Sequence, residues 1–193
     1  KNNHIAKTET ILIQKKNIIT NNKKINVVIS AYDCPEYIEE CLDSINNQTY
    51  KANKILLGID GCQETLKKVL SIRNKYPTLE LYYSKDNGGP YLMFNALIQL
   101  IPDDEYIQIF GADDIMNPNM LEKMSTYDTP TVSKHHGVLF IKKQTMNIYG
   151  GFRGWRCAGD SDLISRIKLF IKTNVNYTSK HYVCREHDKQ LTK

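Results

Sequence analysis

Two adjacent carboxylates, Asp113 and Asp114, follow an apolar run at residues 106–110 in the stretch FGADDIMNP. The run predicts a buried strand, and parallel α/β sheets bind ligands where their strands end. Carboxylate oxygens on a short loop suit Mg²⁺ or Mn²⁺, and such a cation would in turn hold the phosphates of a nucleotide. The alternative for an isolated acidic pair is a solvated turn that leads to a helix cap at Asn117 and Pro118.

A second acidic cluster contains Asp160 and Asp162, in the stretch AGDSDL. Either carboxylate is a candidate general base, which takes a proton from a reacting group. Trp155, the single tryptophan, lies just before this cluster. Its ring offers a flat surface on which a sugar can stack, although a lone tryptophan after a turn equally well fills a gap in the core.

Polar residues also follow two earlier apolar runs. Tyr32 offers a flat face for a nucleobase, and Asp33 is an acceptor for base or ribose donors. Asp60 precedes Gly61, where a carboxylate can accept hydrogen bonds from a uracil N–H or a ribose hydroxyl. Taken alone, the first segment is also a capped helix, and the second is a common Asp–Gly turn.

A third polar loop, DNGGP, is rich in glycine, which lets the backbone approach a ligand closely. Asn95 lies on the helix predicted to follow, where it is placed to line a pocket. The alternative for this segment is a tight turn that starts a helix.

The elements that must position these residues alternate along the chain. Strands are predicted at residues 25–29, 54–59, 79–84 and 106–110, and each of the first three is followed by a helix, the first of which should start at Pro35. A further helix is predicted from about Ser161 to Ile171. Strands that alternate with helices predict right-handed crossovers and a mostly parallel sheet with helices on both faces. The loops at 31–33, 60–62, 86–89 and 113–114 should therefore meet at one edge of the sheet.

The composition fits one soluble globular domain. The chain has 193 residues, of which 41% are hydrophobic. Residues 1–24 are predicted to form an extension or linker, with an edge strand around residues 11–13, and residues 25–193 the domain. The net charge of +5 comes from scattered lysines without a basic, aromatic-flanked block, so specific nucleic-acid binding is not expected. Because the chain begins with Lys1 rather than methionine, we expect a processed or excised chain whose flanking domains are missing.

The five cysteines have no CxxC spacing and are odd in number, which favours free thiols in a reducing compartment such as the cytoplasm. No apolar run has the length of a membrane span, so we expect a soluble protein, with peripheral attachment to a membrane left open. His181, Cys184 and His187 have the spacing HxxCxxH, but alternation along a strand would point Cys184 away from both histidines.

Considered together, the motifs strongly resemble those of the family 2 glycosyltransferases, and the resemblance extends from residue 25 to about residue 192. The segments that carry it, in order, are VVISAYDCPEYIEECLDSINNQTY, IDGCQET, DNGGPYLMFNAL, FGADDIMNP, GGFRGWRCAGDSDL and YVCREHDKQLT. An ordered series of this kind is far more specific than any single motif. It implies an α/β fold of the GT-A type, a Rossmann-like, mostly parallel sheet flanked by helices in a single domain.

The resemblance also implies roles. Asp60 would contact the base, Asp113 and His187 would hold Mn²⁺ or Mg²⁺ on the diphosphate, and Asp160 would be the catalytic base, with Asp162 as the fallback. The predicted donor site comprises Ala31, Tyr32, Asp33, Asp60, Asn87, Gly88, Asn95 and Asp114. The predicted acceptor side comprises Arg153 and Trp155. The nucleotide-sugar-binding half would span about 25–117 and the acceptor half about 118–193.

The implied activity is metal-assisted, inverting transfer of a sugar from a nucleotide diphosphate donor to a hydroxyl of a glycan or glycoconjugate, with Asp60 favouring a UDP-sugar. Gly111 stands where the family has the first aspartate of its DXD motif, and Gly159 stands where an acidic residue commonly precedes the base. The alternative is therefore a degenerate, non-catalytic module that binds glycans or nucleotides. A nucleotidyltransferase would need a glycine-rich basic loop after the first strand, where this chain has AYDCPEY.

Overall fold

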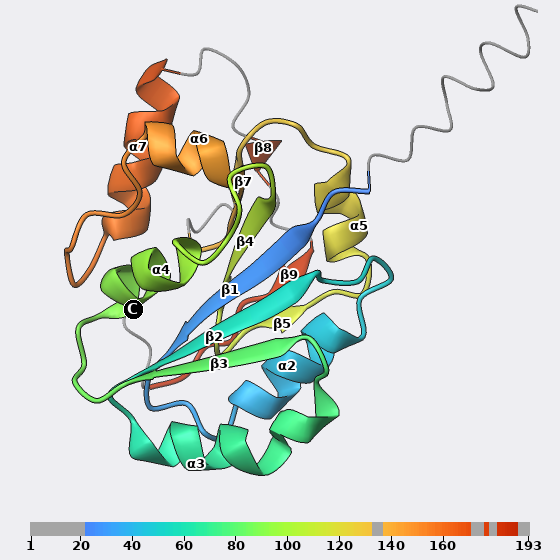
Figure 1. The fold of residues 1–193 in the computed structure, drawn as a ribbon, viewed down its shortest axis with the longest axis vertical. Helices are drawn as coiled ribbons and strands as arrows, with labels where there is room; N and C mark the ends of the chain where they lie inside the picture. The colour runs from blue at the N-terminus through green and yellow to red at the C-terminus, as the bar shows by residue number, and fades with distance from the viewer. Residues whose placement is uncertain (1–21, 133–136, 171–175, 178–180, 189–193) are drawn as a thin grey trace, which may run out of the picture.

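The computed structural model describes residues 22–132, 137–170, 176–177 and 181–188. The sheet at its centre has the strand order β3-β2-β1-β4-β7-β6-β8. Figure 1 shows β3, β2, β1 and β4 side by side. Its parallel part consists of β1 (Ile25–Ala31), β2 (Lys54–Asp60), β3 (Leu79–Ser84) and β4 (Tyr106–Gly111). The predicted strands 25–29, 54–59, 79–84 and 106–110 are thus confirmed. Most of the predicted extension, including its edge strand, lies outside the described residues.

The remaining strands are short and mostly antiparallel. β7 (Leu139–Lys142) pairs antiparallel with β4 and with β6 (Thr131–Val132), and β6 pairs parallel with β8 (Asn176–Tyr177). A separate two-stranded ladder joins β5 (Ile115–Met116) to β9 (Tyr182–Val183), so the chain's last described segment returns to the loop after β4. This ladder places residues 184–188 next to Asp113 and Asp114.

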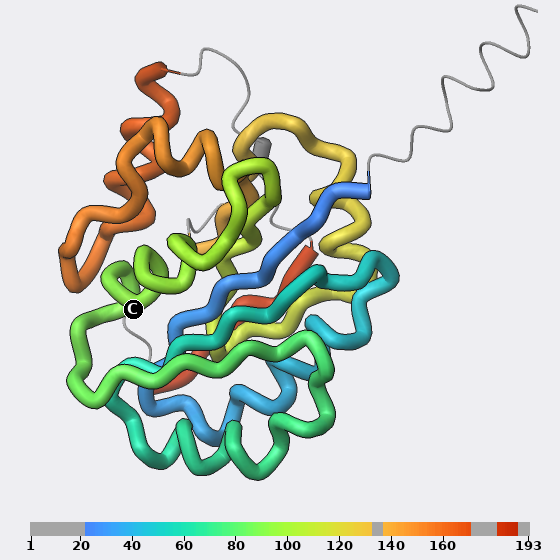
Figure 2. Tube along the Cα trace, in the orientation of Figure 1, coloured from blue at the N-terminus to red at the C-terminus, as the bar shows by residue number. Residues whose placement is uncertain are grey.

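Helices cover both faces of the sheet, as expected. The helices are α2 (Ile38–Asn46), α3 (Gln63–Ile72), η1 (Arg73–Lys75), α4 (Pro90–Ile98), α5 (Met120–Ser125), α6 (Lys143–Ile148) and α7 (Gly159–Phe170). Figures 1 and 2 show α2 and α3 on one side of the sheet and α4, α6 and α7 on the other. In the part of the chain that the structure describes, no helix is both long and apolar enough to cross a membrane.

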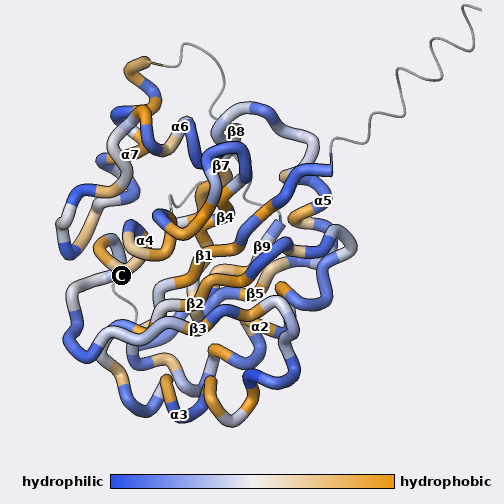
Figure 3. Tube along the Cα trace, viewed as in Figure 1, coloured by the Kyte–Doolittle hydropathy of each residue, from blue (hydrophilic) through white to orange (hydrophobic). Residues whose placement is uncertain are grey.

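The sheet separates two hydrophobic cores. Alternate residues of β1 enter different cores, since Val27 and Ile29 pack toward α2 and Val28 packs toward α4. All three are fully buried, and Figure 3 shows hydrophobic stretches along the central strands. Burial on both faces explains why β1 and β2 are nearly continuous apolar runs in the sequence.

Two helix boundaries differ from the sequence prediction. A helix was expected from Pro35, yet α2 begins at Ile38 because the carbonyl of Cys34 accepts hydrogen bonds from the N–H groups of both Tyr37 and Ile38, which closes a turn first. α7 begins at Gly159 rather than near Ser161. Asp160 therefore lies in the first turn of that helix, where a carboxylate is favoured by the helix dipole.

Candidate active site

The carboxyl ends of the four parallel strands lie side by side. In the sheet register, Ser30 pairs with Gly111, and Asp60 pairs with Ser84. The loops after β1, β2, β3 and β4 therefore meet at one edge of the sheet, as the sequence predicted. β1 lies between β2 and β4, so successive strands are added first on one side of β1 and then on the other. Open α/β sheets bind ligands at such a switch point.

Asp60 holds the loop that follows β3. Its carboxylate is 3% exposed and accepts hydrogen bonds from the N–H of Gly88, at 3.0 Å, and from the N–H of Gly89, at 2.8 Å. Gly89 has a φ of +91°, a conformation that favours glycine. Asp60 thus has a structural task in addition to the predicted contact with a base, which stays a prediction.

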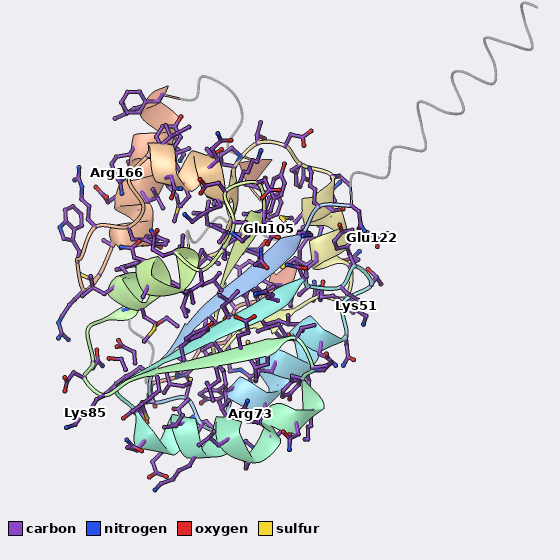
Figure 4. The ribbon with its side chains drawn as sticks, in the orientation of Figure 1. Lys51, Arg73, Lys85, Glu105, Glu122 and Arg166 are labelled. Carbon is purple, nitrogen blue, oxygen red and sulfur yellow. The ribbon has the colours of Figure 1, made fainter. Side chains whose placement is uncertain are left out.

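The same loop contacts the segment before α7. The side-chain carbonyl of Asn87 accepts a hydrogen bond from the N–H of Gly89, and its backbone carbonyl accepts one from Arg156. Lys85, labelled in Figure 4, marks this loop. The predicted donor residues Asn87 and Gly88 are thus placed next to the segment that carries Arg153 and Trp155.

The loop after β1 presents the other predicted donor residues. Ala31 is fully buried at the end of the strand, and its predicted contact with the donor stays a prediction. Tyr32 is 58% exposed, which leaves its ring free to stack on a base. Asp33 has a φ of +45°, in the left-handed region that a non-glycine residue seldom adopts. Strained backbone of this kind clusters at ligand sites.

Asp113 and His187 lie together, and their predicted role as metal ligands stays a prediction. The Nε2 atom of His187 is 2.9 Å from Oδ2 of Asp113. The His187 ring packs on that of Tyr37, with 4.6 Å between centroids. Arg185 donates a hydrogen bond from Nε to the backbone carbonyl of Asp113, and its guanidinium lies 4.9 Å from the centroid of the Tyr37 ring.

Asp114 is buried behind Asp113 and is 8% exposed. Burial, together with the neighbouring charge of Asp113, raises the pKa of the Asp114 carboxyl to about 6. Its Oδ1 atom accepts the backbone N–H of Arg185 at 3.1 Å, which fixes the C-terminal segment at this site. Cys184 also hydrogen-bonds the Asp114 carboxyl, and burial raises the pKa of this thiol to about 11.

Gly111 is explained by the carboxylates next to it. A Cβ atom at this position would lie 2.7 Å from Oδ2 of Asp114 and 3.0 Å from Oδ1 of Asp113. The space of an aspartate side chain at residue 111 is therefore already filled. In the part of the chain that the structure describes, no group of three or more His, Cys, Asp or Glu side chains is arranged to hold a metal ion.

Asp160 is held by Tyr91. The Tyr91 hydroxyl donates a hydrogen bond of 3.0 Å to Oδ1 of Asp160. Burial, and then the Asp160 charge, raises the pKa of Tyr91 to about 12, so the hydroxyl keeps its proton at neutral pH. The close approach of Tyr91 also explains Gly159, because a Cβ atom at residue 159 would lie 2.7 Å from the Tyr91 ring.

Asp162 is occupied by two arginines. Its Oδ1 atom is 3.0 Å from Arg153, and its Oδ2 atom is 2.8 Å from Arg166. Arg166, labelled on α7 in Figure 4, also donates to the carbonyls of Tyr149 and Gly151. Asp162 therefore anchors the segment before α7, and the predicted role of Asp160 as the catalytic base stays a prediction.

The predicted acceptor residues lie on this anchored segment. Trp155 is 48% exposed, which is the state needed for stacking rather than for filling a core gap. The Arg153 guanidinium lies 5.7 Å from the centroid of the Trp155 ring. Asn95 lies on α4 as expected, but its carboxamide both donates to and accepts from the backbone of Phe152. Asn95 thus fixes the segment from inside, and its predicted contact with the donor stays a prediction.

Sequence reasoning did not single out Tyr91 or Arg166. Tyr91 meets an acidic residue 69 positions later, and no spacing rule connects the two. Arg166 did carry a local signal, because it follows Asp162 by four residues, the spacing of a helical ion pair.

Residues 26–128, just over half of the chain, match the model of glycosyl transferase family 2. The chain belongs to this family. A relative from Haemophilus influenzae, described as an uncharacterized glycosyltransferase, is 31% identical over 104 residues, which cover 53% of this chain and 32% of the relative. This family 2 chain therefore spans about a third of that relative's length.

Solved structures give the fold. The structure of residues 1–349 of TarS of Staphylococcus aureus in complex with UDP-GlcNAc has a TM-score of 0.74 at 16% identity, covering 86% of this chain and 60% of that one. The mannosyltransferase PcManGT of Pyrobaculum calidifontis, in complex with GDP-Man and Mn²⁺, has a TM-score of 0.72 at 16% identity, covering 81% and 55%. The predicted fold, a GT-A type mostly parallel sheet flanked by helices, is confirmed for this family 2 member.

Proposed function

We propose that this chain is the catalytic domain of an inverting glycosyltransferase. It transfers a sugar from a nucleotide diphosphate donor, a UDP-sugar, to a hydroxyl of a glycan or glycoconjugate. Residues 25–117 form the nucleotide-sugar half and residues 118–193 the acceptor half. Membership of family 2 supports sugar transfer, and the fold shared with TarS, whose structure holds UDP-GlcNAc, supports the uridine donor.

The observation that carries the proposal is the Tyr91–Asp160 contact at the start of α7. The hydrogen bond orients one carboxylate oxygen of Asp160 and leaves the other for an acceptor hydroxyl. A carboxylate placed in this way takes the hydroxyl proton as the oxygen attacks the anomeric carbon, and direct attack inverts that centre. Asp162 is less suited, since both its oxygens pair with arginines.

The donor would lie across the carboxyl ends of β1 and β4. Tyr32 stacks on the base, while Asp33 and the loop held by Asp60 bind the ribose and base edges. Arg185, fixed between Asp113 and Glu40, brings a positive charge to the diphosphate side of the site.

The residues at the diphosphate end fit a divalent cation. Asp113 presents a carboxylate oxygen 2.9 Å from the Nε2 atom of His187, and Mg²⁺ is commonly held by one or two carboxylates plus substrate phosphates. Such an ion offsets the charge that builds up on the leaving nucleoside diphosphate. The crowding at Gly111 agrees with this smaller ligand set, in which a third carboxylate has no place.

The test is hydrolysis of a panel of nucleotide sugars, with Mn²⁺, Mg²⁺ or EDTA, followed by release of the nucleoside diphosphate. Asp160→Asn should lower turnover by about 10²- to 10⁴-fold while donor binding stays within twofold. Asp104→Asn is the matched control, because it removes one exposed carboxylate before β4, at the opposite edge of the sheet.

Each result has a consequence. Metal-dependent release from one donor identifies the sugar, and release unaffected by EDTA removes Asp113 and His187 from the proposal as metal ligands. Full activity of Asp160→Asn would remove Asp160 from the mechanism. No release from any donor, together with no donor binding, would favour the alternative of a degenerate binding module, which the Gly111 position motivates.

A further inference from the structure

A small pocket of about 80 Å³ lies beside Asp160. Its walls come from α4, β4, β7 and α7 and include Phe94, Ile109, Leu139 and Ile164. The volume exceeds what a single water needs but is far below the ~300 Å³ of pockets that enclose a whole ligand. The pocket therefore has room for one substituent of a larger molecule.

Three aromatic rings hold the pocket open. Tyr91 and Phe94 pack on Phe152, with centroid separations of 5.3 and 5.6 Å. The three residues are each at most 9% exposed, so the rings belong to the core behind α4 and cannot turn outward without unpacking it. A wall of this kind keeps its shape before a ligand arrives, which lowers the entropy cost of binding.

The lining of the pocket is almost entirely apolar. Among the lining residues that the structure describes, Asp160 carries the single charge, and the other side chains are apolar apart from the Tyr91 hydroxyl. That hydroxyl already donates to Asp160. A hydroxyl group placed against the apolar side chains, away from the Asp160 carboxylate, would lose water without gaining a partner, whereas a methyl group there would gain about 0.8 kcal/mol.

We propose that this pocket selects an acceptor sugar that carries a methyl group close to the hydroxyl that is glycosylated. The methyl can belong to an acetamido group or to a deoxy sugar, since both present the same compact apolar surface. This inference rests on the proposed function, because the role of Asp160 as base is what places the reacting hydroxyl at the mouth of the pocket.

Gly137 is a lining residue at which a side chain can be added to test the pocket. It lines the pocket, and no described atom lies within 4 Å of the position of a Cβ there. Gly137→Val therefore adds three carbons to open space without displacing a core residue. Ala96→Leu, on the exposed side of α4, also adds three carbons and is the matched control.

The experiment measures sugar binding by saturation-transfer NMR on the whole chain, so it does not depend on turnover. The probes are N-acetylglucosamine against glucose, and D-fucose, which is 6-deoxy-D-galactose, against D-galactose. We expect the methyl protons to receive the strongest saturation, and the methyl-bearing sugar to bind about fourfold more tightly than its partner, as one buried methyl implies. Gly137→Val should abolish this preference and Ala96→Leu should keep it.

The outcomes separate the two proposals. A preference in the first pair assigns an acetamido sugar and a preference in the second assigns a deoxy sugar. Equal binding within both pairs, no binding of either methyl-bearing sugar by folded protein, or a preference that survives Gly137→Val would overturn the pocket assignment. A parallel titration with UDP tests the donor side, so lost nucleotide binding with retained methyl preference would count against the proposed transfer and leave the pocket in place.

Discussion

Replacing Asp60 by asparagine distinguishes a carboxylate that contacts a base from one that holds a loop. In the structure both oxygens accept backbone N–H groups, at 3.0 Å from Gly88 and 2.8 Å from Gly89. Asparagine keeps one acceptor, which suits the buried N–H of Gly89, and turns an NH₂ group toward Gly88, which is exposed. One charge-assisted bond is lost, so the free energy of unfolding should fall by about 2 kcal/mol.

The assay is urea unfolding together with titration of UDP and GDP. If Asp60 acts by holding the loop, Asp60→Asn lowers the free energy of unfolding. It also weakens the binding of UDP and GDP by a similar factor, because the displaced loop affects both ligands. Asp86→Asn, an exposed aspartate on the same loop, should change neither quantity. Unchanged stability combined with a selective loss of UDP binding would refute this reasoning and assign Asp60 to the base.

Three further variants test the site. Tyr91→Phe removes the donor to Asp160. We expect kcat to fall about tenfold with KM nearly unchanged, and an unchanged kcat would contradict the positioning role. Gly111→Asp places a Cβ 2.7 Å from Oδ2 of Asp114. Calorimetry should show that the free energy of unfolding falls by about 1–3 kcal/mol. Equal or greater stability would show that the carboxylates can rearrange. Burial raises the pKa of Asp114 to about 6 from the ordinary 3.8, so the folded chain retains a proton that the unfolded chain releases. In EDTA the free energy of unfolding should therefore fall by up to about 3 kcal/mol as the pH rises from about 4 to 7, and urea titrations of Asp114→Asn should lack that fall.

The arrangement of the sheet was predictable because its information is local. Runs such as residues 54–59 are apolar and bounded by turn residues, and short loops between strands and helices force a parallel order. Once that order holds, the carboxyl ends must meet, so the proximity of Asp33, Asp60 and Asp113 to one edge followed from topology alone.

Pairings between loops were not predictable in the same way. Nothing in the sequence indicates that the Asp60 carboxylate would accept the N–H groups of Gly88 and Gly89, since that depends on the conformation of the loop after β3. α6 was also missed, because its sequence KQTMNI has no capping signal. It forms where Lys143 is buried by long-range contacts, including an ion pair of 3.6 Å with Asp103.

The two hydrophobic cores on opposite faces of the sheet support different halves of the site. The loop of Asp113 begins at Ala112, which packs in the core under α2, whereas Tyr91 packs in the core under α4. Substitutions in one core leave the packing of the other almost untouched, and effects of separated sites add. The acceptor preference of such a chain can therefore drift over generations while the nucleotide it uses stays the same.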